Sequence, residues 1–335
     1  MSGSGCIGTL RNEVGTSMKI LIVNFDNLGD VVFSSCIADT LSHYFPSAQI
    51  DVLCSSYAKD IAACYPGIDT VYDLAPPWRA SLQQKKGSLS EYLRILNLLR
   101  QTRYDVMLCA SIHWKDVLGA RMVRAEQYVG FFKRPFVRKL LTSSCPVPDD
   151  TEPIVQAMQR LVSAAFPDFP ENLEPRYRLI PPEGNKGKGL SSIVLHPFSG
   201  DVRKTWPLEN WLELAEQLRE RYRLCWIGSP VDLANFRKSG VVSPSEIASA
   251  GKVTEVGGTL KLLSGAKFFI GHDSGPTHMA CGLGKRGLAL YPPHTVRKYY
   301  PQGVGAFQHL VGNPIGLLKV DEVLATVMDG LCDSP

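Results

Sequence analysis

Residues 270–280 read IGHDSGPTHMA, and this stretch indicates the fold more strongly than any other part of the chain. An apolar run at 266–270 predicts a strand that ends here, and the segment 274–281 predicts a helix that begins here. The first N–H groups of a helix have no intrahelical partner, and the helix dipole makes them attractive to anions. A strand that passes through glycines into a helix therefore predicts a diphosphate-binding site.

The same turn allows two other interpretations. Asp273-Ser274-Gly275 can be read as the nucleophile loop of a serine hydrolase, but the G-x-S-x-G spacing that such a loop needs is absent. His278 can equally be a core histidine whose ring nitrogens are satisfied by hydrogen bonds. We therefore favour the diphosphate site and leave the role of His278 open on the residues alone.

Strand-like and helix-like runs alternate on both sides of this stretch. In the first half, the predicted strands are residues 19–25, 50–54, 70–73, 104–108 and 127–129, and the predicted helices are residues 30–44, 90–102 and 154–166. In the second half, the predicted strands are residues 192–196, 223–228, 266–270 and 287–291, and the predicted helices are residues 207–221, 259–264, 274–281 and 320–331. This alternation predicts an α/β fold with two Rossmann-like domains, whose parallel sheets face a central cleft outside the carboxyl ends of their strands.

Composition predicts where the domains begin and end. Residues 1–17 are rich in Gly, Ser and Thr, and residues 167–189 are rich in Pro, Glu and Gly. Both compositions are typical of segments without a packed core. We expect a disordered leader at 1–17, an N-terminal domain at 18–170, a linker at 171–190 and a C-terminal domain at 191–335, with the last helix packed back on the N-terminal domain.

The bulk composition excludes several classes of protein. The chain has 335 residues, 44% of them hydrophobic, and a net charge of +4, which is too mild for a dedicated nucleic-acid binder. Its nine cysteines have no spacing typical of a zinc site or a disulfide framework. No apolar run reaches the roughly 18 residues of a membrane span, and no secretion signal is evident. We therefore expect a cytoplasmic protein with no nucleic-acid partner.

Asp30 closes the segment NFDNLGD at 24–30, at the carboxyl end of the first predicted strand. Open α/β sheets present catalytic groups at this edge, and Gly29 lets a ligand approach the backbone closely. Asp30 is therefore a candidate general base. A carboxylate in the first turn of a helix also interacts favourably with the helix dipole, so the position by itself supports a structural role equally well.

Arg203 and Lys204 lie in the polar loop HPFSGDVRKTWP at 196–207, between a strand and a helix of the second half. They lie about one turn before Pro207, a residue favoured at helix starts, so their charges fall near an anion-attracting helix end. This position favours phosphate binding. The alternative is a solvated loop around a buried Trp206.

These segments together resemble glycosyltransferase family 9, the bacterial heptosyltransferases. The resemblance covers essentially residue 18 to the end of the chain. Its anchors, in chain order, are Leu28-Gly29-Asp30, then His196-Pro197 with Lys204-x-Trp206-Pro207, then Asp273-Ser274-Gly275-Pro276-x-His278-x-Ala280 with Gly282-x-Gly284. Three motifs in this order are far more specific than any one of them.

The resemblance implies a GT-B fold, an ADP-heptose donor, inversion at the anomeric carbon, no metal or other cofactor, and an acceptor in the inner core of lipopolysaccharide. It implies that Asp30 is the catalytic base and that Lys204 binds phosphate. It places Asp273, Ser274, Gly275 and His278 in the donor-binding turn. It places Gly228, Asp232, Thr259 and Leu260 near the nucleoside.

The chain departs from the family pattern at several positions. Positions 24 and 27, often basic in the family, are both Asn. The loop that usually reads Phe-Gly-Pro-Thr is Tyr-Pro-Pro-His at 291–294, and Arg286 replaces a common proline. The donor class is therefore more firmly implied than the donor sugar or the contacts to the acceptor.

The segment 76–141 carries many more Lys and Arg residues than acidic ones. A phosphorylated lipid acceptor would be attracted to such a surface, with the protein in peripheral contact with the inner face of the inner membrane. We expect Arg121 and Arg124 to contact this acceptor. The alternative is a solvated surface whose charges serve solubility.

Two other functions remain open on the sequence. A nucleotide-sugar epimerase can be built on the same two-domain fold, and analysis of the reaction product would separate it from a transferase. A non-catalytic sugar-nucleotide-binding protein would bind the donor without turnover on any acceptor.

Overall fold

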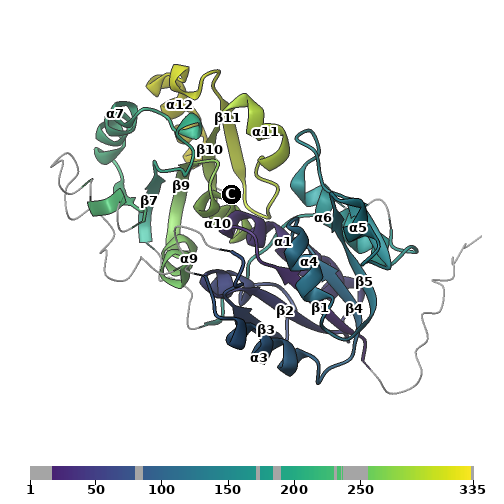
Figure 1. Ribbon diagram of the computed structural model, residues 1–335. Coiled ribbons are helices and arrows are strands. Elements are labelled where there is room, and N and C mark those ends of the chain that lie inside the picture. The colour runs from purple at the N-terminus through teal and green to yellow at the C-terminus, as the bar shows by residue number, and fades with distance from the viewer. Residues whose placement is uncertain are drawn as a thin grey trace, which may run out of the picture.

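The computed structural model describes residues 17–79, 86–170, 174–183, 190–229, 232–234, 236 and 256–332. Nearly all of the predicted leader, residues 1–16, lies outside the described residues, as do residues 171–173 and 184–189 of the predicted linker. Figure 1 shows two lobes, each built on one sheet. All strand pairs in both sheets are parallel, which confirms the predicted α/β class.

The N-terminal sheet has the strand order β3-β2-β1-β4-β5-β6. Its strands are β1 (Lys19–Asn24), β2 (Gln49–Ser55), β3 (Thr70–Leu74), β4 (Tyr104–Cys109), β5 (Ala125–Phe132) and β6 (Ser143–Pro146). Its helices are α1 (Leu28–Tyr44), α2 (Lys59–Ala62), α3 (Leu89–Leu99), α4 (Trp114–Ala120), α5 (Pro135–Arg138) and α6 (Ile154–Ala165). The order reverses between β1 and β4, so the carboxyl end of β1 lies at a topological switch point, where open α/β sheets hold ligands.

Side chains of β1 alternate between two apolar cores, as the two-residue period of a strand requires. Ile20 and Ile22 belong to the core shared with α1, α2 and α6. Leu21 and Val23 belong to the core shared with α3, α4 and α5. The helices therefore form two layers, and α3, α4 and α5 make up the layer on the face opposite α1.

The C-terminal sheet has the strand order β11-β10-β9-β7-β8. Its strands are β7 (Leu190–His196), β8 (Arg223–Trp226), β9 (Ala266–His272), β10 (Gly287–Tyr291) and β11 (Phe307–Val311). The helices around it are α7 (Leu208–Arg219), α9 (Val256–Gly265), α10 (Gly275–Gly282), α11 (Pro293–Tyr299) and α12 (Val320–Cys332). The predicted strand–turn–helix at 270–280 is therefore the passage from β9 into α10.

The sequence pattern does not predict β6, β11, α4 or α11. β6 and β11 are edge strands whose side chains are largely exposed or half-buried, so neither has the apolar run of a central strand. α4 and α11 have seven residues each. A helix of two turns is too short for an apolar stripe to stand out from chance.

α12 packs on the C-terminal sheet, and the expectation that it returns to the N-terminal domain is wrong. Its buried residues Val320, Val323, Val327 and Leu331 belong to the C-terminal core, together with apolar residues of α7 and β10. The spacing of these residues makes one continuous apolar stripe, which the C-terminal sheet covers fully.

One apolar core joins the two lobes and positions the helices at their junction. Residues of α1 and α6 share this core with residues of α9 and α10. The segment 174–183 runs between the lobes: the N–H of Leu179 donates to the carbonyl of Gly282 at 2.8 Å, and the N–H of Ile180 donates to the carbonyl of Cys64 at 2.7 Å. The starts of α1 and α10 are therefore held against each other.

No helix in the described part of the chain is long and apolar enough to cross a membrane. The eight cysteines in the described ranges are free thiols: Cys332 is exposed, Cys225 is half-buried and the other six are buried. They contribute to the apolar cores as small hydrophobic side chains.

Candidate active site

The amino ends of α1 and α10 meet at the junction of the lobes because glycines allow a close approach. A Cβ placed on Gly275 would lie 3.3 Å from the Cβ of Leu28 and 3.7 Å from the backbone nitrogen of Gly29. A Cβ placed on Gly29 would lie 3.6 Å from Cδ2 of His278. Two of the three predicted motifs, LGD and DSGPTH, are thus brought into contact, with both helix starts facing one site.

Asp30 lies in the first turn of α1, as predicted. Burial, together with the nearby charge of Asp26, raises the pKa of Asp30 to about 7. A backbone hydrogen bond from Asn27 and the charges of Arg79 and Lys298 act in the opposite direction. A carboxyl group with a pKa near neutrality is well suited to accept a proton, since the basic form is populated and still has a real affinity for protons.

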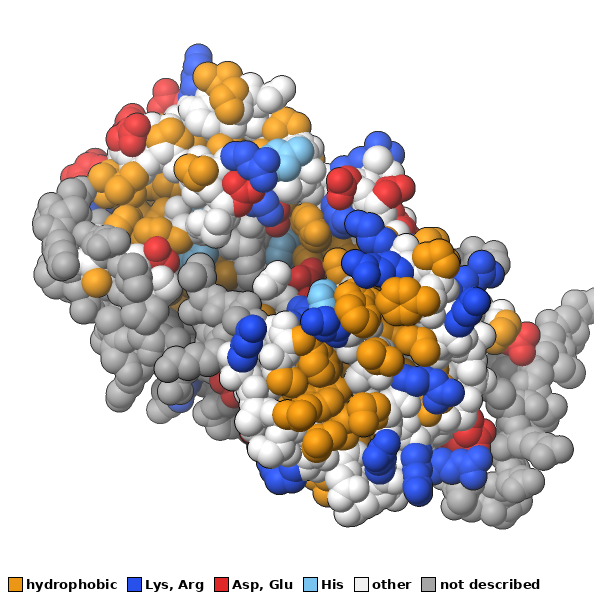
Figure 2. Space-filling model, viewed as in Figure 1, with side chains coloured by type: hydrophobic (Ala, Val, Ile, Leu, Met, Phe, Trp, Pro, Cys, Tyr) orange, Lys and Arg blue, Asp and Glu red, His pale blue; other side chains and the backbone are white. Residues whose placement is uncertain are grey.

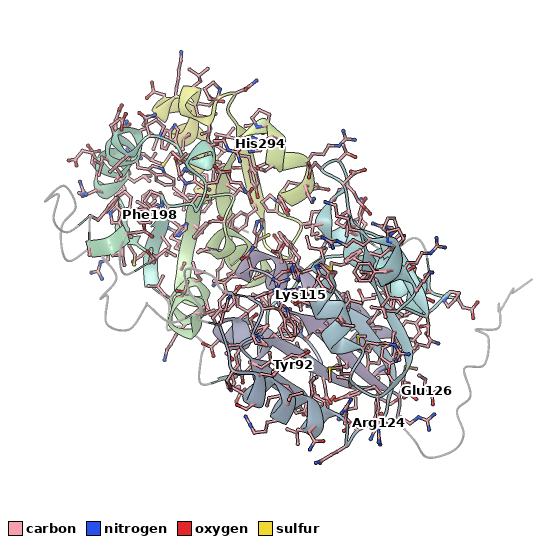
Figure 3. All side chains as sticks on the ribbon, viewed as in Figure 1. Tyr92, Lys115, Arg124, Glu126, Phe198 and His294 are labelled. Atoms are coloured by element: carbon pink, nitrogen blue, oxygen red, sulfur yellow. The ribbon has the colours of Figure 1, made fainter. Side chains whose placement is uncertain are left out.

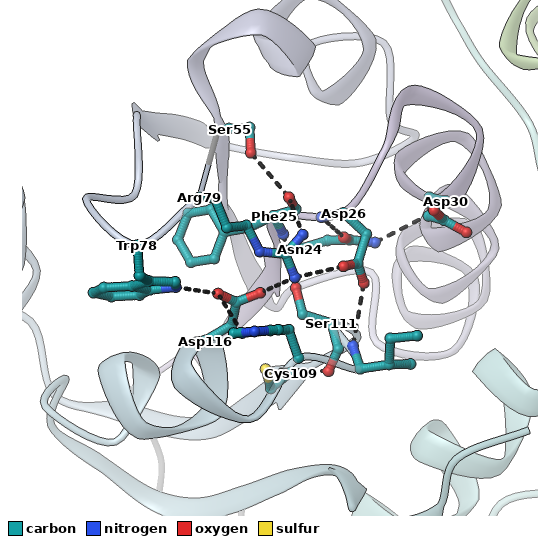
Figure 4. Close-up of polar contacts among 12 residues, drawn as sticks. Asn24, Phe25, Asp26, Asp30, Ser55, Trp78, Arg79, Cys109, Ser111 and Asp116 are labelled. Carbon is teal, nitrogen blue, oxygen red and sulfur yellow. Dashed lines mark hydrogen bonds and ion pairs between the residues drawn. The ribbon is translucent and has the colours of Figure 1, made fainter. Parts of the chain in front are cut away.

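Asp26 belongs to a chain of charges that the sequence analysis did not single out (Figure 4). Nη2 of Arg79 lies 2.6 Å from Oδ1 of Asp26 and 2.5 Å from Oδ2 of Asp116. The N–H of Ile112 donates to Oδ2 of Asp26 at 3.1 Å, and Nε1 of Trp78 donates to Asp116 at 2.8 Å. Two buried carboxylates are thus compensated by one guanidinium, which explains how both are accommodated.

Lys204 reaches the start of α10, although it lies just before α7 in the sequence. Its Nζ is 2.7 Å from Oδ2 of Asp273, and Nε2 of His278 lies 3.4 Å from Oδ1 of the same carboxyl group. Burial by itself would raise the pKa of Asp273, but the hydrogen bond from His278 and the charges of His278 and Lys204 lower it below its ordinary value. Asp273 is therefore ionised and holds Lys204 beside the helix start.

This geometry changes the role expected for Asp273. A carboxylate repels a diphosphate, so its contribution to an anion site is to fix the cations around it. The neighbouring Arg203 does not reach the site, because its guanidinium is paired with Asp201 at 2.7 Å in the exposed loop. Of the two adjacent basic residues, Lys204 alone lies at the start of α10.

Ser274 is the N-cap residue of α10, but its side chain makes no capping hydrogen bond. Its Oγ lies 3.2 Å from Nδ1 of His196, at the end of β7. Burial lowers the pKa of His196 to about 4, so the imidazole is neutral and a weak base. A weak base does not activate a serine for nucleophilic attack, which argues against the hydrolase interpretation. At the start of α10, Pro276 has no N–H and the N–H groups of Thr277 and His278 donate to the carbonyl of Ser274, so this helix end attracts an anion mainly through its dipole.

Lys298 and Tyr299 at the end of α11 complete the group of polar side chains. Nζ of Lys204 and Nζ of Lys298 each lie 5.7 Å from the centroid of the Tyr299 ring. Lys298 also spans the lobes, since its Nζ lies 3.2 Å from Oδ1 of Asp150. The sequence analysis missed both residues because they lie in a short helix without an apolar stripe. The sequence did offer one indication: Lys298 and Tyr299 lie shortly after the loop 291–294, where the chain differs from the family pattern.

The residues expected near the nucleoside lie at the carboxyl end of β8 and on α9. A Cβ on Gly228 would lie 2.6 Å from the ring of Phe198, so Gly228 packs tightly on an aromatic side chain. Asp232 accepts hydrogen bonds from the N–H and the hydroxyl of Ser229. Thr259 is half-buried on α9. Leu260 is 2% exposed and belongs to the core between the lobes, so its side chain is not available to a ligand.

Arg121 and Arg124 lie far from Asp30, so the acceptor contact expected of them stays a prediction and would involve a part of the acceptor away from Asp30. The carbonyl of Arg124 accepts from the N–H of Tyr104, the first residue of β4. Both arginines are therefore at the amino edge of the sheet, whereas Asp30 follows the carboxyl end of β1. Figure 3 places Lys115 near the junction of the lobes and Arg124 at the distant end of the N-terminal lobe. Charge composition predicts a basic segment but not its orientation.

Within the described ranges, no three His, Cys, Asp or Glu side chains come together as a group that could hold a metal ion. Positive charge at the site within these ranges comes from Lys204, Lys298, Arg79 and the start of α10.

Two parallel α/β sheets with a polar junction at facing helix starts define a GT-B architecture. A solved structure of the same fold is the E. coli heptosyltransferase WaaC with ADP, which aligns with a TM-score of 0.76 at 17% identity and covers 93% of this chain and 100% of that chain. The iron-containing dodecameric glycosyltransferase TibC from enterotoxigenic E. coli is a more distant match, with a TM-score of 0.51 at 12% identity over 94% of this chain and 76% of that chain.

The family assignment comes from the sequence. The model of glycosyltransferase family 9 (heptosyltransferase) matches residues 92–314, and the chain belongs to this family. Among curated proteins, lipopolysaccharide heptosyltransferase 1 of Pseudomonas aeruginosa is 25% identical over 82% of this chain and 79% of its own length. The chain is therefore a glycosyltransferase of the heptosyltransferase family, which agrees with the predicted family and favours transfer over the epimerase alternative.

Proposed function

We propose that this protein is an inverting heptosyltransferase that moves a heptose from ADP-heptose to an acceptor in the lipopolysaccharide core. The observation that carries the proposal is the meeting of two unlike helix starts. One presents a carboxyl group with a pKa of about 7, and the other presents the positive end of a helix dipole beside a lysine. A proton acceptor and an anion site at one junction are what glycosyl transfer from a nucleotide sugar requires.

In the proposed reaction, Asp30 accepts the proton of an acceptor hydroxyl while the hydroxyl oxygen bonds to the anomeric carbon. The bond from that carbon to the diphosphate breaks, and its electron pair leaves with ADP. Lys204 and the positive end of the α10 dipole stabilise the negative charge that develops on the departing diphosphate. Asp273 keeps Lys204 in place, and Lys298 adds a second positive charge.

The choice of donor and acceptor rests on relatives. The curated matches are named lipopolysaccharide or lipooligosaccharide heptosyltransferases, and the WaaC structure was determined with ADP. We propose the same substrate class for this chain, together with a cytoplasmic location at the inner face of the inner membrane. The lipid-anchored acceptor would be available there.

We further propose that the diphosphate is bound without a divalent cation. The support is that Lys204, Lys298 and a helix start supply positive charge where a metal would otherwise be needed. Activity is expected to persist in EDTA. Loss of turnover in EDTA, restored by magnesium, manganese or iron, would contradict metal independence while leaving the proposed transfer intact.

The transfer itself is tested with purified protein, ADP-heptose and a lipopolysaccharide acceptor that lacks heptose. The expected result is release of ADP together with an acceptor whose mass increases by one heptose. UDP-glucose and GDP-mannose serve as control donors and should give no product. ADP-heptose binding without any product would favour the non-catalytic alternative, and an isomerised sugar nucleotide without transfer would favour the epimerase.

A further inference from the structure

The layer formed by α3, α4 and α5 exposes apolar side chains on the outer face of the N-terminal lobe. Figure 2 shows hydrophobic side chains gathered over this layer. We call the following set the apolar face: Leu89, Leu93, Ile112, Leu118, Met122 and Phe136. Leu89 is 62% exposed, Ile112 is 54% exposed and Phe136 is 45% exposed. A group of exposed apolar side chains of this kind marks an interaction surface.

Positive charge surrounds the apolar face, as Figure 2 shows. Among the described residues of 86–141, the exposed basic ones are Lys86, Arg94, Arg100, Arg103, Arg121, Arg124, Lys133, Arg134, Arg138 and Lys139. Among the described residues of 86–141, the exposed acidic ones are Glu91 and Glu126, and Glu126 is paired with Arg103 at 3.1 Å. The border of the apolar face is thus strongly positive.

Two basic hollows lie beside the apolar face. One has a volume of about 730 Å³, and Arg100, Arg121, Arg124 and Tyr128 contribute to its lining. The guanidinium of Arg121 lies 3.8 Å from the centroid of the Tyr128 ring, which holds it in place. The other has a volume of about 500 Å³ and is lined by Phe132, Pro135, Arg138 and Lys139. Arginine in such hollows is well suited to phosphate groups.

The apolar face begins at the candidate active site. Ile112 follows β4, and its N–H donates to the carboxylate of Asp26 while its side chain is exposed. Lys115, one turn further along, lies near the junction of the lobes in Figure 3. A partner seated on the apolar face would therefore reach the edge of the site that holds Asp30.

We propose that the apolar face is a membrane-docking surface for an anionic lipid bilayer. Its leucines and Phe136 would insert among the acyl chains near the headgroups, while the surrounding Arg and Lys residues bind lipid phosphates. The combination of an apolar centre with a positive border matches the interfacial region of such a bilayer. The link between docking and catalysis rests on the proposed function, because a lipid-anchored acceptor would then be delivered to Asp30. The docking itself does not depend on that function.

The test is flotation of the purified protein with vesicles. The wild-type protein is expected to float with vesicles of phosphatidylcholine mixed with phosphatidylglycerol, less in high salt, and weakly with phosphatidylcholine alone. Leu93→Glu with Leu118→Glu should lower binding to the anionic vesicles by about tenfold or more, since two apolar anchors are lost. Arg121→Gln with Arg124→Gln should lower it by about tenfold, since two headgroup contacts are lost.

Matched controls use exposed residues of the other lobe. Val311→Glu with Leu317→Glu, and Lys261→Gln with Lys319→Gln, should leave vesicle binding unchanged. The Leu93→Glu, Leu118→Glu protein should retain its turnover on a water-soluble acceptor whose acyl chains have been removed, which shows that it is folded. A circular-dichroism melting curve gives the same check if no turnover is found for any variant.

Three results would overturn the proposal. The wild-type protein could fail to float with anionic vesicles, or the control variants could weaken binding as much as the test variants. Alternatively, sedimentation could show a dimer that the Leu93→Glu, Leu118→Glu change abolishes, in which case a second copy of the chain covers the face. A failed transfer assay with normal flotation would reject the proposed function and leave the docking surface intact.

Discussion

Asp30 is half-buried and Asp273 is buried, both at the junction of the lobes, yet their surroundings shift their pKa values in opposite directions. The pKa of Asp30 rises to about 7, because burial and a neighbouring carboxylate outweigh the nearby cations. The pKa of Asp273 falls despite burial, because His278 and Lys204 contact its two oxygens. One carboxyl group is therefore prepared to take up a proton, and the other is fixed as an anion.

This difference teaches that residue type and position at a helix end do not assign a role. Both aspartates lie beside a helix start on a motif of the same family. What separates them is the side chains that other elements bring to each: Arg79 and Asp26 near Asp30, but Lys204 directly on Asp273. The proposed roles of proton acceptor and positioning residue follow from those partners.

The largest expected effect comes from Asp30→Asn, which keeps the size of the side chain and removes the proton acceptor. We expect kcat to fall by about 10² to 10⁴, with ADP binding nearly unchanged. A kcat within about threefold of the wild-type value would remove Asp30 from the mechanism, since that corresponds to less than about 1 kcal/mol of barrier.

The same variant tests whether Asp30 serves stability instead. Because the folded-state pKa of Asp30 is raised, its protonated form stabilises the fold, and this contribution is lost as the pH rises from about 4 through about 7. Asp30→Asn should therefore raise Tm at pH 8, and should raise it less at pH 5. A lower Tm at both pH values with normal kcat would assign Asp30 a structural role.

Lys204→Ala is expected to have the next largest effect. It removes a charge-assisted contact to phosphate worth about 1.5 to 3 kcal/mol, which corresponds to roughly 10- to 150-fold weaker ADP binding. Calorimetry measures this affinity. Arg203→Ala is the matched control, because Arg203 is the adjacent basic residue but is paired with Asp201, and its loss should change ADP affinity little. Equal losses in the two variants would contradict the specific role of Lys204.

The pH dependence of kcat/KM sharpens the contrast between the two aspartates. Activity should rise with pH through about 7, as Asp30 loses its proton. Asp26→Asn removes a neighbouring negative charge and should move this limb to lower pH, by up to about one unit. Arg79→Gln removes a positive charge and should move it to higher pH. If both variants shifted the rise of kcat/KM in the same direction, this rise would not reflect the ionisation of Asp30.

The smallest effect is expected from Arg121→Gln combined with Arg124→Gln. Both residues lie at the amino edge of the N-terminal sheet, so kcat and donor KM should be unchanged. KM for a lipid-anchored acceptor in anionic membranes should rise about three- to tenfold in low salt, because the arginines act through a screened field. An unchanged acceptor KM would leave these charges with a role in solubility.

Much of the architecture could be predicted from the sequence because it is encoded locally. The alternation of apolar runs and helical stripes predicts the parallel sheets, and the IGHDSGPTHMA stretch predicts the passage from β9 into α10. The position of Asp30 in the first turn of α1 follows in the same way. The sequence pattern does not predict short edge elements such as β11, because half-exposed strands carry no apolar run.

The sequence by itself determined the family, the two-sheet fold and the positions of the three motifs, because residues close in the chain fix strands, turns and helix starts. Only the tertiary structure decided which charges meet. Lys204 and Asp273 are 69 positions apart, and Arg79 and Asp26 are 53 apart. Such pairs are set by strand order and by the packing of one lobe on the other, and no local pattern records them. The same holds for Arg121 and Arg124. The sequence shows that both are positively charged, but only the tertiary structure shows that they lie at the amino edge of the N-terminal sheet.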